Sequence, residues 1–147
     1  MLVKACISFI AATGFGVIFN APLQLLIFCG FAGMTGWTVS TWTRMYVIDD
    51  LMLSSFIGAF AVSIIAHLFA RRFKTPMITF SVAGIIPLVP GTVAYNAMRH
   101  VVESDYTMAI QLGSQAFLIS GSVAMGLVFA EVIMQMVFRS KIHIPMR

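Results

Sequence analysis

Charged side chains are scarce in this sequence. Asp, Glu, Lys and Arg make up only 10% of the 147 residues, whereas soluble domains contain about 25% of these residues. The 9 Lys and Arg and 5 Asp and Glu residues are too few to cover the surface of a water-soluble domain. The mean hydropathy of +0.98 agrees. The scarcity nearly excludes a water-soluble enzyme and indicates an integral membrane protein.

Cysteines and reactive clusters are also scarce. The two cysteines, Cys6 and Cys29, lie in apolar runs without His or acidic residues at metal-ligand spacing. We therefore expect two buried thiols rather than a disulfide or a metal site. The sequence contains no nucleophile, base and acid set and no phosphate-binding loop, and its three histidines are isolated. We predict that the protein is not an enzyme and has no cofactor.

Long apolar segments dominate the chain and predict an all-α membrane protein of about five spans, forming a single membrane domain over residues 1–147. The second segment has no charge but contains Gln24 and three glycines, so it could be a short span or a re-entrant element. The first segment favours a retained span over a signal peptide. The last segment is longer than a perpendicular span requires, so we expect it to tilt or project. The five segments cover residues 2–19, 23–42, 51–70, 77–98 and 108–138.

The basic residues predict the orientation of these spans. The formal net charge is +4, but the cations flank apolar segments rather than line an amphipathic face, so we expect no nucleic-acid partner. With five spans, one side holds six Lys and Arg and the other holds three; with four spans the division is seven to two. The excess predicts that the loop at residues 71–74 and the C-terminus are cytoplasmic. Of the two arrangements we favour five spans with the N-terminus outside.

The fourth segment is interrupted by Pro87, Pro90 and Gly91. Pro87 lies ten residues after Met77, about 15 Å along a helix, which places the break near the middle of a bilayer core of about 30 Å. A helix that restarts at Gly91 would leave the N–H groups of residues 91–93 unpaired at its positive end, and such a terminus suits a carboxylate. Transporters place discontinuous helices near the midplane in this way. A simple proline kink, with its carbonyls satisfied by a neighbouring helix, is the alternative.

Polar residues on one face follow this break. Thr92, Tyr95, Asn96 and Arg99 are spaced i, i+3, i+4 and i+7, so they share a helical face that could line a polar path. In the last segment, Gln111 and Gln115 could line the same path or form hydrogen bonds between helices.

Glu131 is the only acidic residue within an apolar segment. An ionised carboxylate at that depth is costly, so Glu131 should be protonated or face a partner or water. It could therefore couple transport to protons or form an ion pair with a basic residue of another helix.

Two stripes of small residues predict packing surfaces between helices. Ser55, Ala59, Ser63 and His67 recur at intervals of four, as do Ser122, Gly126 and Ala130. Small residues let membrane helices approach closely. Gly30, Gly33 and Gly36 indicate close packing of the second segment in the same way.

Several of these motifs resemble the threonine/serine exporter family of the ThrE type. The resemblance rests on the sequence of residues 86–91, Ile-Pro-Leu-Val-Pro-Gly, followed by Ala94 and Tyr95, and on residues 14–15 and 19–22 with the later stretch 30–37. It is closest to the small, YjjB-like subunits, which match the C-terminal membrane half of the fused exporters. The motif positions that carry over are Asn20, Pro22, Pro87, Pro90, Gly91 and Tyr95.

The resemblance implies a bacterial inner-membrane exporter driven by the proton gradient, which works with a larger multi-span subunit equivalent to the N-terminal half of the fused proteins. It implies export of threonine or serine, or of succinate-like dicarboxylates, and an odd span number that lets two halves sit inverted. A non-transporting membrane scaffold that stabilises another membrane protein is the alternative function.

Overall fold

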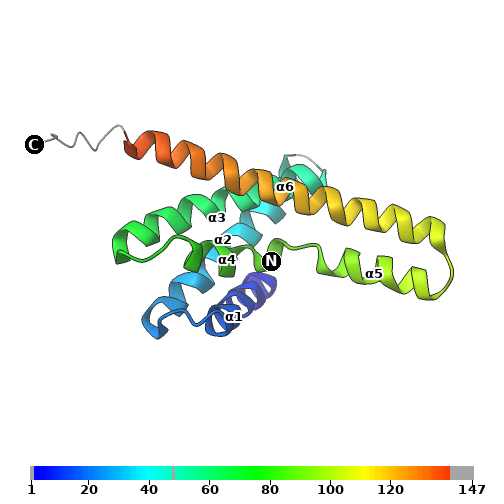
Figure 1. The fold of residues 1–147 in the computed structure, drawn as a ribbon, viewed down its shortest axis with the longest axis horizontal. Helices are drawn as coiled ribbons and strands as arrows, with labels where there is room; N and C mark the ends of the chain where they lie inside the picture. The colour runs from blue at the N-terminus through cyan, green and yellow to red at the C-terminus, as the bar shows by residue number, and fades with distance from the viewer. Residues whose placement is uncertain (1, 48, 140–147) are drawn as a thin grey trace, which may run out of the picture.

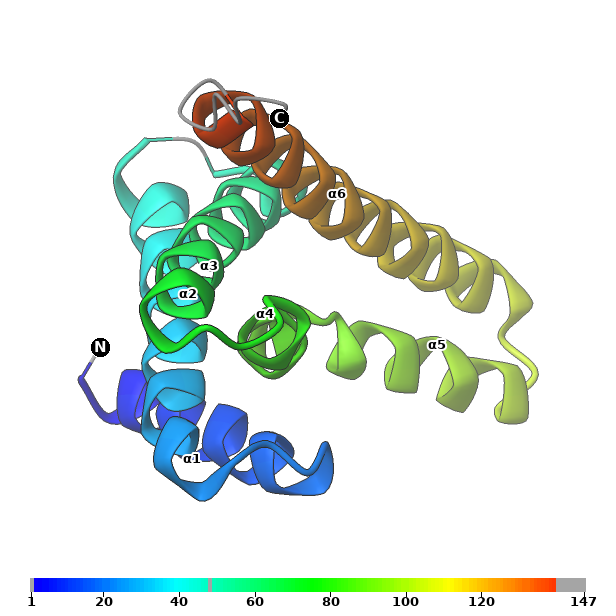
Figure 2. The ribbon, with the colours of Figure 1, turned by 60° about the vertical axis from the view of Figure 1, so that its left-hand side comes forward.

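The computed structural model describes residues 2–47 and 49–139, and these residues form helices and no strand. Figures 1 and 2 show a body built from the first four α-helices and a long hairpin that projects from it. The elements are α1 (Leu2–Ile18), η1 (Leu23–Leu25), α2 (Leu26–Tyr46), α3 (Leu51–Phe73), α4 (Ile78–Ile85), η2 (Ile86–Leu88), α5 (Gly91–Val102) and α6 (Tyr106–Arg139). The all-α membrane fold expected from the composition is confirmed.

Three helices of the described residues are long and apolar enough to cross a membrane, and α4 with α5 makes a fourth if the bent pair counts as one span. The ambiguous second segment is a continuous helical stretch over Leu23–Tyr46, long enough for a full span rather than a short re-entrant element. α1 has 17 residues, which is the lower limit for a span of about 17–25 residues. The fifth span therefore depends on α1 and stays a prediction.

Left-handed residues end three of the helices. Asn20, Lys74 and Ser104 have φ of 55°, 53° and 63°. Each is followed by a backbone hydrogen bond that spans five residues, such as Ala21 N–H to the carbonyl of Gly16 at 3.0 Å. This is the Schellman geometry, which satisfies the last carbonyls of a helix and reverses the chain. Asn20 is therefore explained first by the turn between α1 and α2.

The two predicted stripes pack against each other between α3 and α6. Ser63 donates a hydrogen bond to the Leu127 carbonyl at 3.5 Å. A side chain at Gly126 would lie 2.5 Å from the carbonyl oxygen of Phe56 and 3.1 Å from Cβ of Ala59. The stripes thus bring two backbones into direct contact, as small residues allow.

The glycines of α2 make similar contacts with three neighbours. A Cβ at Gly30 would clash with Phe9, one at Gly33 would clash with Ala12, and one at Gly36 would clash with Val62. α2 therefore lies close to α1 on one side and to α3 on another, which confirms the predicted close packing.

α5 and α6 form a hairpin that extends away from the other helices (Figures 1 and 2). α5 packs principally against the first half of α6, and α3 packs against the remainder of α6. α4 lies instead among α1, α2 and α3. The interrupted fourth segment thus belongs to the body at one end and to the projecting hairpin at the other.

One cysteine differs from the expectation. Cys29 is buried in a cluster with Leu25, Ala66, Phe80 and Ala83, as predicted. Cys6 is exposed on α1. Sequence hydropathy identifies an apolar helix but not which of its faces other helices cover, and Cys6 lies on a face that no other described helix covers.

Candidate functional site: a polar cleft at the broken helix

The break between α4 and α5 occurs at the prolines and glycine that predicted it. α4 ends at Ile85, a single 3-10 turn covers Ile86–Leu88, and α5 begins at Gly91. Between them Val89 is extended, with φ −64° and ψ 130°, and Pro90 has φ −76° and ψ 52°. The two helical parts are bent by 53°. Because proline has no N–H and resists helix continuation, the helical hydrogen-bond pattern is interrupted here.

Two of the three N–H groups expected to be unpaired at the start of α5 are unpaired. The N–H of Gly91 donates to the Val89 carbonyl at 2.8 Å, and the regular helical pattern starts with Ala94 donating to Pro90 at 3.0 Å. The N–H groups of Thr92 and Val93 have no protein acceptor among the described residues. The prediction was thus wrong for Gly91, because a tight turn at Val89 and Pro90 supplies an acceptor. Two donors remain at the positive end of α5.

A cleft of about 810 Å³ lies beside this break. Its walls come from the start of α1, the last part of α2, the start of α3, the break itself and Ile119 of α6. Seven of the lining residues are charged or carry a hydroxyl, namely Lys4, Arg44, Asp49, Ser40, Thr41, Ser55 and Thr92. A concave site of this volume is in the usual range of about 300–1,000 Å³ for small-molecule sites.

The charged lining comes from three separate segments. Lys4 lies near the start of α1, Arg44 lies in the last turn of α2, and Asp49 lies in the connection to α3. Nε of Arg44 is 3.9 Å from Oδ1 of Asp49, and the two side chains are 55% and 95% exposed. An exposed pair at that distance is weak. The cleft therefore has two cations and one carboxylate, all of them accessible to water.

Three of the predicted site residues line the cleft: Pro87, Pro90 and Thr92. Gly91 is exposed at the start of α5, and a side chain at this position would meet nothing within 4 Å. Tyr95 and Asn96 are exposed on α5 beyond the cleft. They share the face of Thr92, as the spacing predicted, whereas the buried Ala97 lies on another face.

The structure does not bring the other predicted residues to the cleft. Asn20 and Pro22 lie at the opposite end of α1 from Lys4. Gln111 is exposed and Gln115 half-buried on the projecting part of α6. A role for these residues in translocation stays a prediction.

Glu131 is exposed on α6, where it accepts a hydrogen bond at 3.2 Å from Nε2 of Gln135. Within the described residues it forms no ion pair with another helix. The predicted intramolecular pair is therefore not found.

A smaller apolar pocket of about 210 Å³ lies on the other side of the break, against α6. Val89 and Pro90 line both this pocket and the polar cleft. These two residues of the break therefore border both a polar and an apolar cavity.

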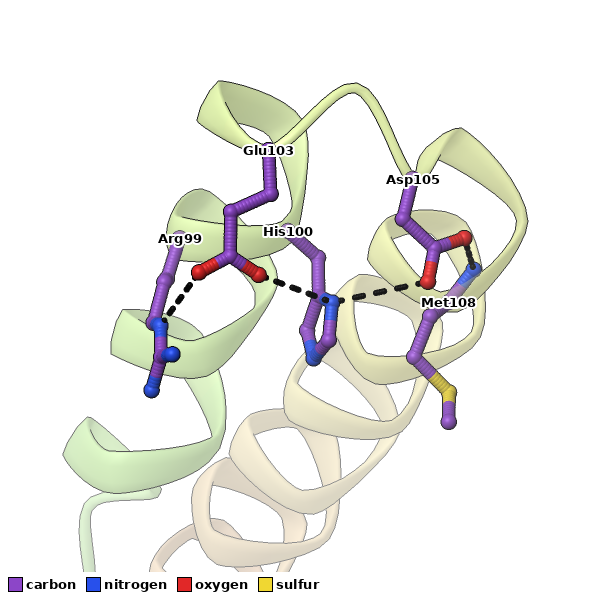
Figure 3. Close-up of polar contacts among 5 residues, drawn as sticks. All are labelled: Arg99, His100, Glu103, Asp105 and Met108. Atoms are coloured by element: carbon purple, nitrogen blue, oxygen red, sulfur yellow. Dashed lines mark hydrogen bonds and ion pairs between the residues drawn. The ribbon is translucent and has the colours of Figure 1, made fainter.

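A second group of charges lies at the far end of α5 (Figure 3). Nδ1 of His100 lies 3.8 Å from Oε2 of Glu103 and 3.6 Å from Oδ2 of Asp105. Nε of Arg99 donates to Oε1 of Glu103 at 2.8 Å. Asp105 also accepts from the N–H of Met108 at 3.3 Å. These contacts hold the turn of the hairpin and are separated from the cleft by the length of α5.

Sequence reasoning missed the cations of the cleft because it treated Lys4 and Arg44 only as signals of orientation. It also missed Trp37, Ser40 and Ser55 as lining residues. Ser55 lies on a predicted stripe of small residues, but such a stripe is equally typical of helix packing and does not by itself indicate a lining residue. The basic residues Lys141 and Arg147, which entered the orientation count, lie outside the described residues.

Comparisons with known proteins agree with this picture. The model of a family described as "Threonine/Serine exporter, ThrE" matches residues 4–133. An uncharacterised protein from Haemophilus influenzae (strain ATCC 51907 / DSM 11121 / KW20 / Rd) is 28% identical over 94 residues, which is 64% of this chain and 31% of that protein. The aligned region thus spans about a third of that relative's length. No solved structure matches the chain. The match over most of the sequence, with the broken helix inside it, shows that this multi-pass membrane chain belongs to the threonine/serine exporter family.

Proposed function

We propose that the chain is the small subunit of a two-component secondary exporter for small carboxylate-bearing metabolites. Threonine and serine are the first candidates and succinate-like dicarboxylates the second. Membership of an exporter family supports transport. The resemblance of its motifs to the C-terminal membrane half of the fused exporters supports a division of the transporter between two subunits.

The observation that carries the proposal is the polar cleft at the break. Pro87 and Pro90 contribute to its wall, and Thr92 lies where α5 restarts. In secondary transporters, discontinuous helices place half-helix ends against anionic groups at the substrate site. The unpaired N–H groups of Thr92 and Val93 would supply such donors here.

The projecting hairpin supports the need for a partner. Thr92, Tyr95 and Asn96 on α5 and Gln111 on α6 are exposed. Polar groups that face lipid are costly and usually face protein or a water-filled cavity instead. In this proposal the larger multi-span subunit covers these residues, so that the hairpin and the partner together enclose the translocation path.

Proton coupling rests on Glu131 in this proposal. It is exposed on α6 with only Gln135 as a hydrogen-bond donor among the described residues. A carboxylate in an apolar helix is a functional candidate when no structural pair explains it. Glu131→Gln should abolish gradient-driven export while the complex still assembles.

The protein would lie in the bacterial inner membrane with its C-terminus in the cytoplasm. The orientation follows from the excess of basic residues in the predicted cytoplasmic segments. A reporter that fluoresces only in the cytoplasm, fused after residue 147, tests this orientation. Fluorescence is expected only if the C-terminus is cytoplasmic.

The main test is export of labelled threonine and succinate from cells that lack both subunits and receive one or both genes. We expect export only with both genes and its loss on adding an uncoupler. Equal export by the small subunit alone would refute the two-component division. Export that survives the uncoupler would refute proton coupling.

Variants at the break separate a transporter from a scaffold. Pro90→Ala combined with Gly91→Leu should abolish export and leave membrane insertion intact, since a side chain at Gly91 meets no neighbour within 4 Å. A non-transporting scaffold would instead retain flux in Tyr95 and Asn96 variants whenever the complex forms. Co-purification measured beside flux decides between the two.

A further inference from the structure

We propose that Lys4 and Arg44 together bind the carboxylate of the transported solute in the polar cleft. This inference rests on the proposed function, because it assigns a step of that transport to two side chains. The fold brings the two cations to one cavity although they lie 40 positions apart in the sequence and on different helices.

Arg71, Arg72 and Arg99 do not line the cleft. Arg71 and Arg72 lie in the last turn of α3, whereas Leu51, the first residue of the same helix, lines the cleft. Arg99 lies near the end of α5 and is bound to Glu103 at 2.8 Å. Lys4 and Arg44 therefore differ from these other basic residues in their position at the cleft, although all of them carry the same charge.

The local charge favours an anion. The cleft holds two cations against the single carboxylate of Asp49, and a concave site lined with one excess sign of charge concentrates ligands of the other sign. Arg44 is held only at 3.9 Å by the exposed Asp49. A carboxylate that enters the cleft can therefore replace Asp49 at the planar guanidinium, which binds carboxylates with two parallel hydrogen bonds.

The shape favours a small solute over a lipid headgroup. The cations share the cleft with the hydroxyl groups of Ser40, Thr41 and Ser55. A volume of about 810 Å³ accommodates a small polar molecule with its water. Arg44 and Lys4 thus face a cavity that also contains groups able to bind the hydroxyl or second carboxylate of a solute.

Trp37 provides a direct binding readout because it lines the same cleft. The chain has two tryptophans, so Trp42→Phe leaves Trp37 as the only one. The purified chain in phosphatidylcholine nanodiscs would be titrated with sodium succinate and with threonine while Trp37 emission is recorded. Lys4→Gln and Arg44→Gln are then compared with Arg72→Gln, which neutralises an exposed cation in the last turn of α3, outside the cleft.

We expect each cleft variant to weaken binding about tenfold, the size of one lost charge-assisted hydrogen bond, and Arg72→Gln to leave it unchanged. Arg44→Lys should recover part of the affinity, which a folding defect would not allow. Far-UV circular dichroism checks that helix content is retained. Equal affinities for the original chain and the Lys4→Gln, Arg44→Gln double variant would overturn the proposal.

Export from cells with the variant gene at its own locus separates this inference from the proposed function. Loss of export in the cleft variants, with Arg72→Gln still active, supports both. Unchanged export and unchanged binding in the double variant overturn the cation site and leave the exporter intact. Cation-dependent binding without any export by the original chain supports the site and overturns the exporter. No binding and no export overturn both.

The lipid composition of the nanodiscs separates a solute site from a lipid site. Binding that is abolished when phosphatidylglycerol replaces phosphatidylcholine would assign the cations to lipid headgroups and overturn the solute site.

Discussion

The contact between α3 and α6 can be tested with a matched pair of glycines on α6. A Cβ at Gly126 would lie 2.5 Å from the backbone oxygen of Phe56 and 3.1 Å from Cβ of Ala59. A Cβ at Gly121 would meet nothing within 4 Å. Both substitutions to alanine add the same atoms and make the same change in helix propensity, so any difference between them reports on the packing.

The expected magnitude follows from the clash. An ordinary contact begins near 3.4 Å, so Gly126→Ala must separate the two backbones by about 0.9 Å. A gap of about 0.5–1 Å forfeits a quarter to a half of the dispersion attraction along the crossing, and overpacking costs about 1–3 kcal/mol. The propensity gain of Gly→Ala, about 1 kcal/mol, offsets part of this cost. We expect Gly126→Ala to lower the free energy of unfolding by up to about 2 kcal/mol and Gly121→Ala to raise it by up to about 1 kcal/mol.

Unfolding in mixed micelles with increasing sodium dodecyl sulfate, followed by circular dichroism, measures both variants against the original chain. The two changes should have opposite signs. If Gly126→Ala were as stable as Gly121→Ala, the two helices would not be in backbone contact at this crossing, and the packing described for the two stripes would be refuted.

Three further predictions concern the turns and the cysteines. Asp50 accepts a hydrogen bond at 2.9 Å from the N–H of Met52 at the start of α3, so Asp50→Ala should cost about 0.5–2 kcal/mol in the same unfolding assay; an unchanged midpoint would contradict the cap. Asn20 has φ 55°, so Asn20→Ala should cost about 1–2 kcal/mol while Asn20→Gly does not, because only alanine pays for the left-handed backbone. In detergent, a maleimide should label the exposed Cys6 and leave the buried Cys29 unmodified until the chain is denatured; labelling of a Cys6→Ser variant at the original rate would refute this difference.

The break was predictable because its causes are local. Pro87 and Pro90 lack the N–H that a helix needs, and their effect does not depend on what surrounds them. The small-residue stripes were predictable for a related reason, since spacing alone places Ser55, Ala59 and Ser63 on one face.

The cleft could not be predicted because its causes are not local. Lys4, Arg44 and Asp49 come from three segments that meet only when α1, α2 and α3 pack. Spacing also could not reveal that the stripe on α3 pairs with that on α6 rather than with α2. Likewise, Cys6 and Cys29 have similar apolar neighbours in sequence, and only the packing of α2 against α3 and α4 buries Cys29 while Cys6 stays exposed.

The length of α6 links membrane thickness to the bend of the fourth segment. Its 34 residues extend about 51 Å. Even at a tilt of about 40°, the upper end of what membrane helices adopt, this length covers about 39 Å of depth, against a hydrocarbon core of about 30 Å. A thinner bilayer therefore favours a larger tilt of α6 from the bilayer normal. Both α5 and α3 pack against α6, so the hairpin and the body tilt together with it. The thickness of the membrane therefore sets the depth at which the bend of the fourth segment and the cleft beside it lie.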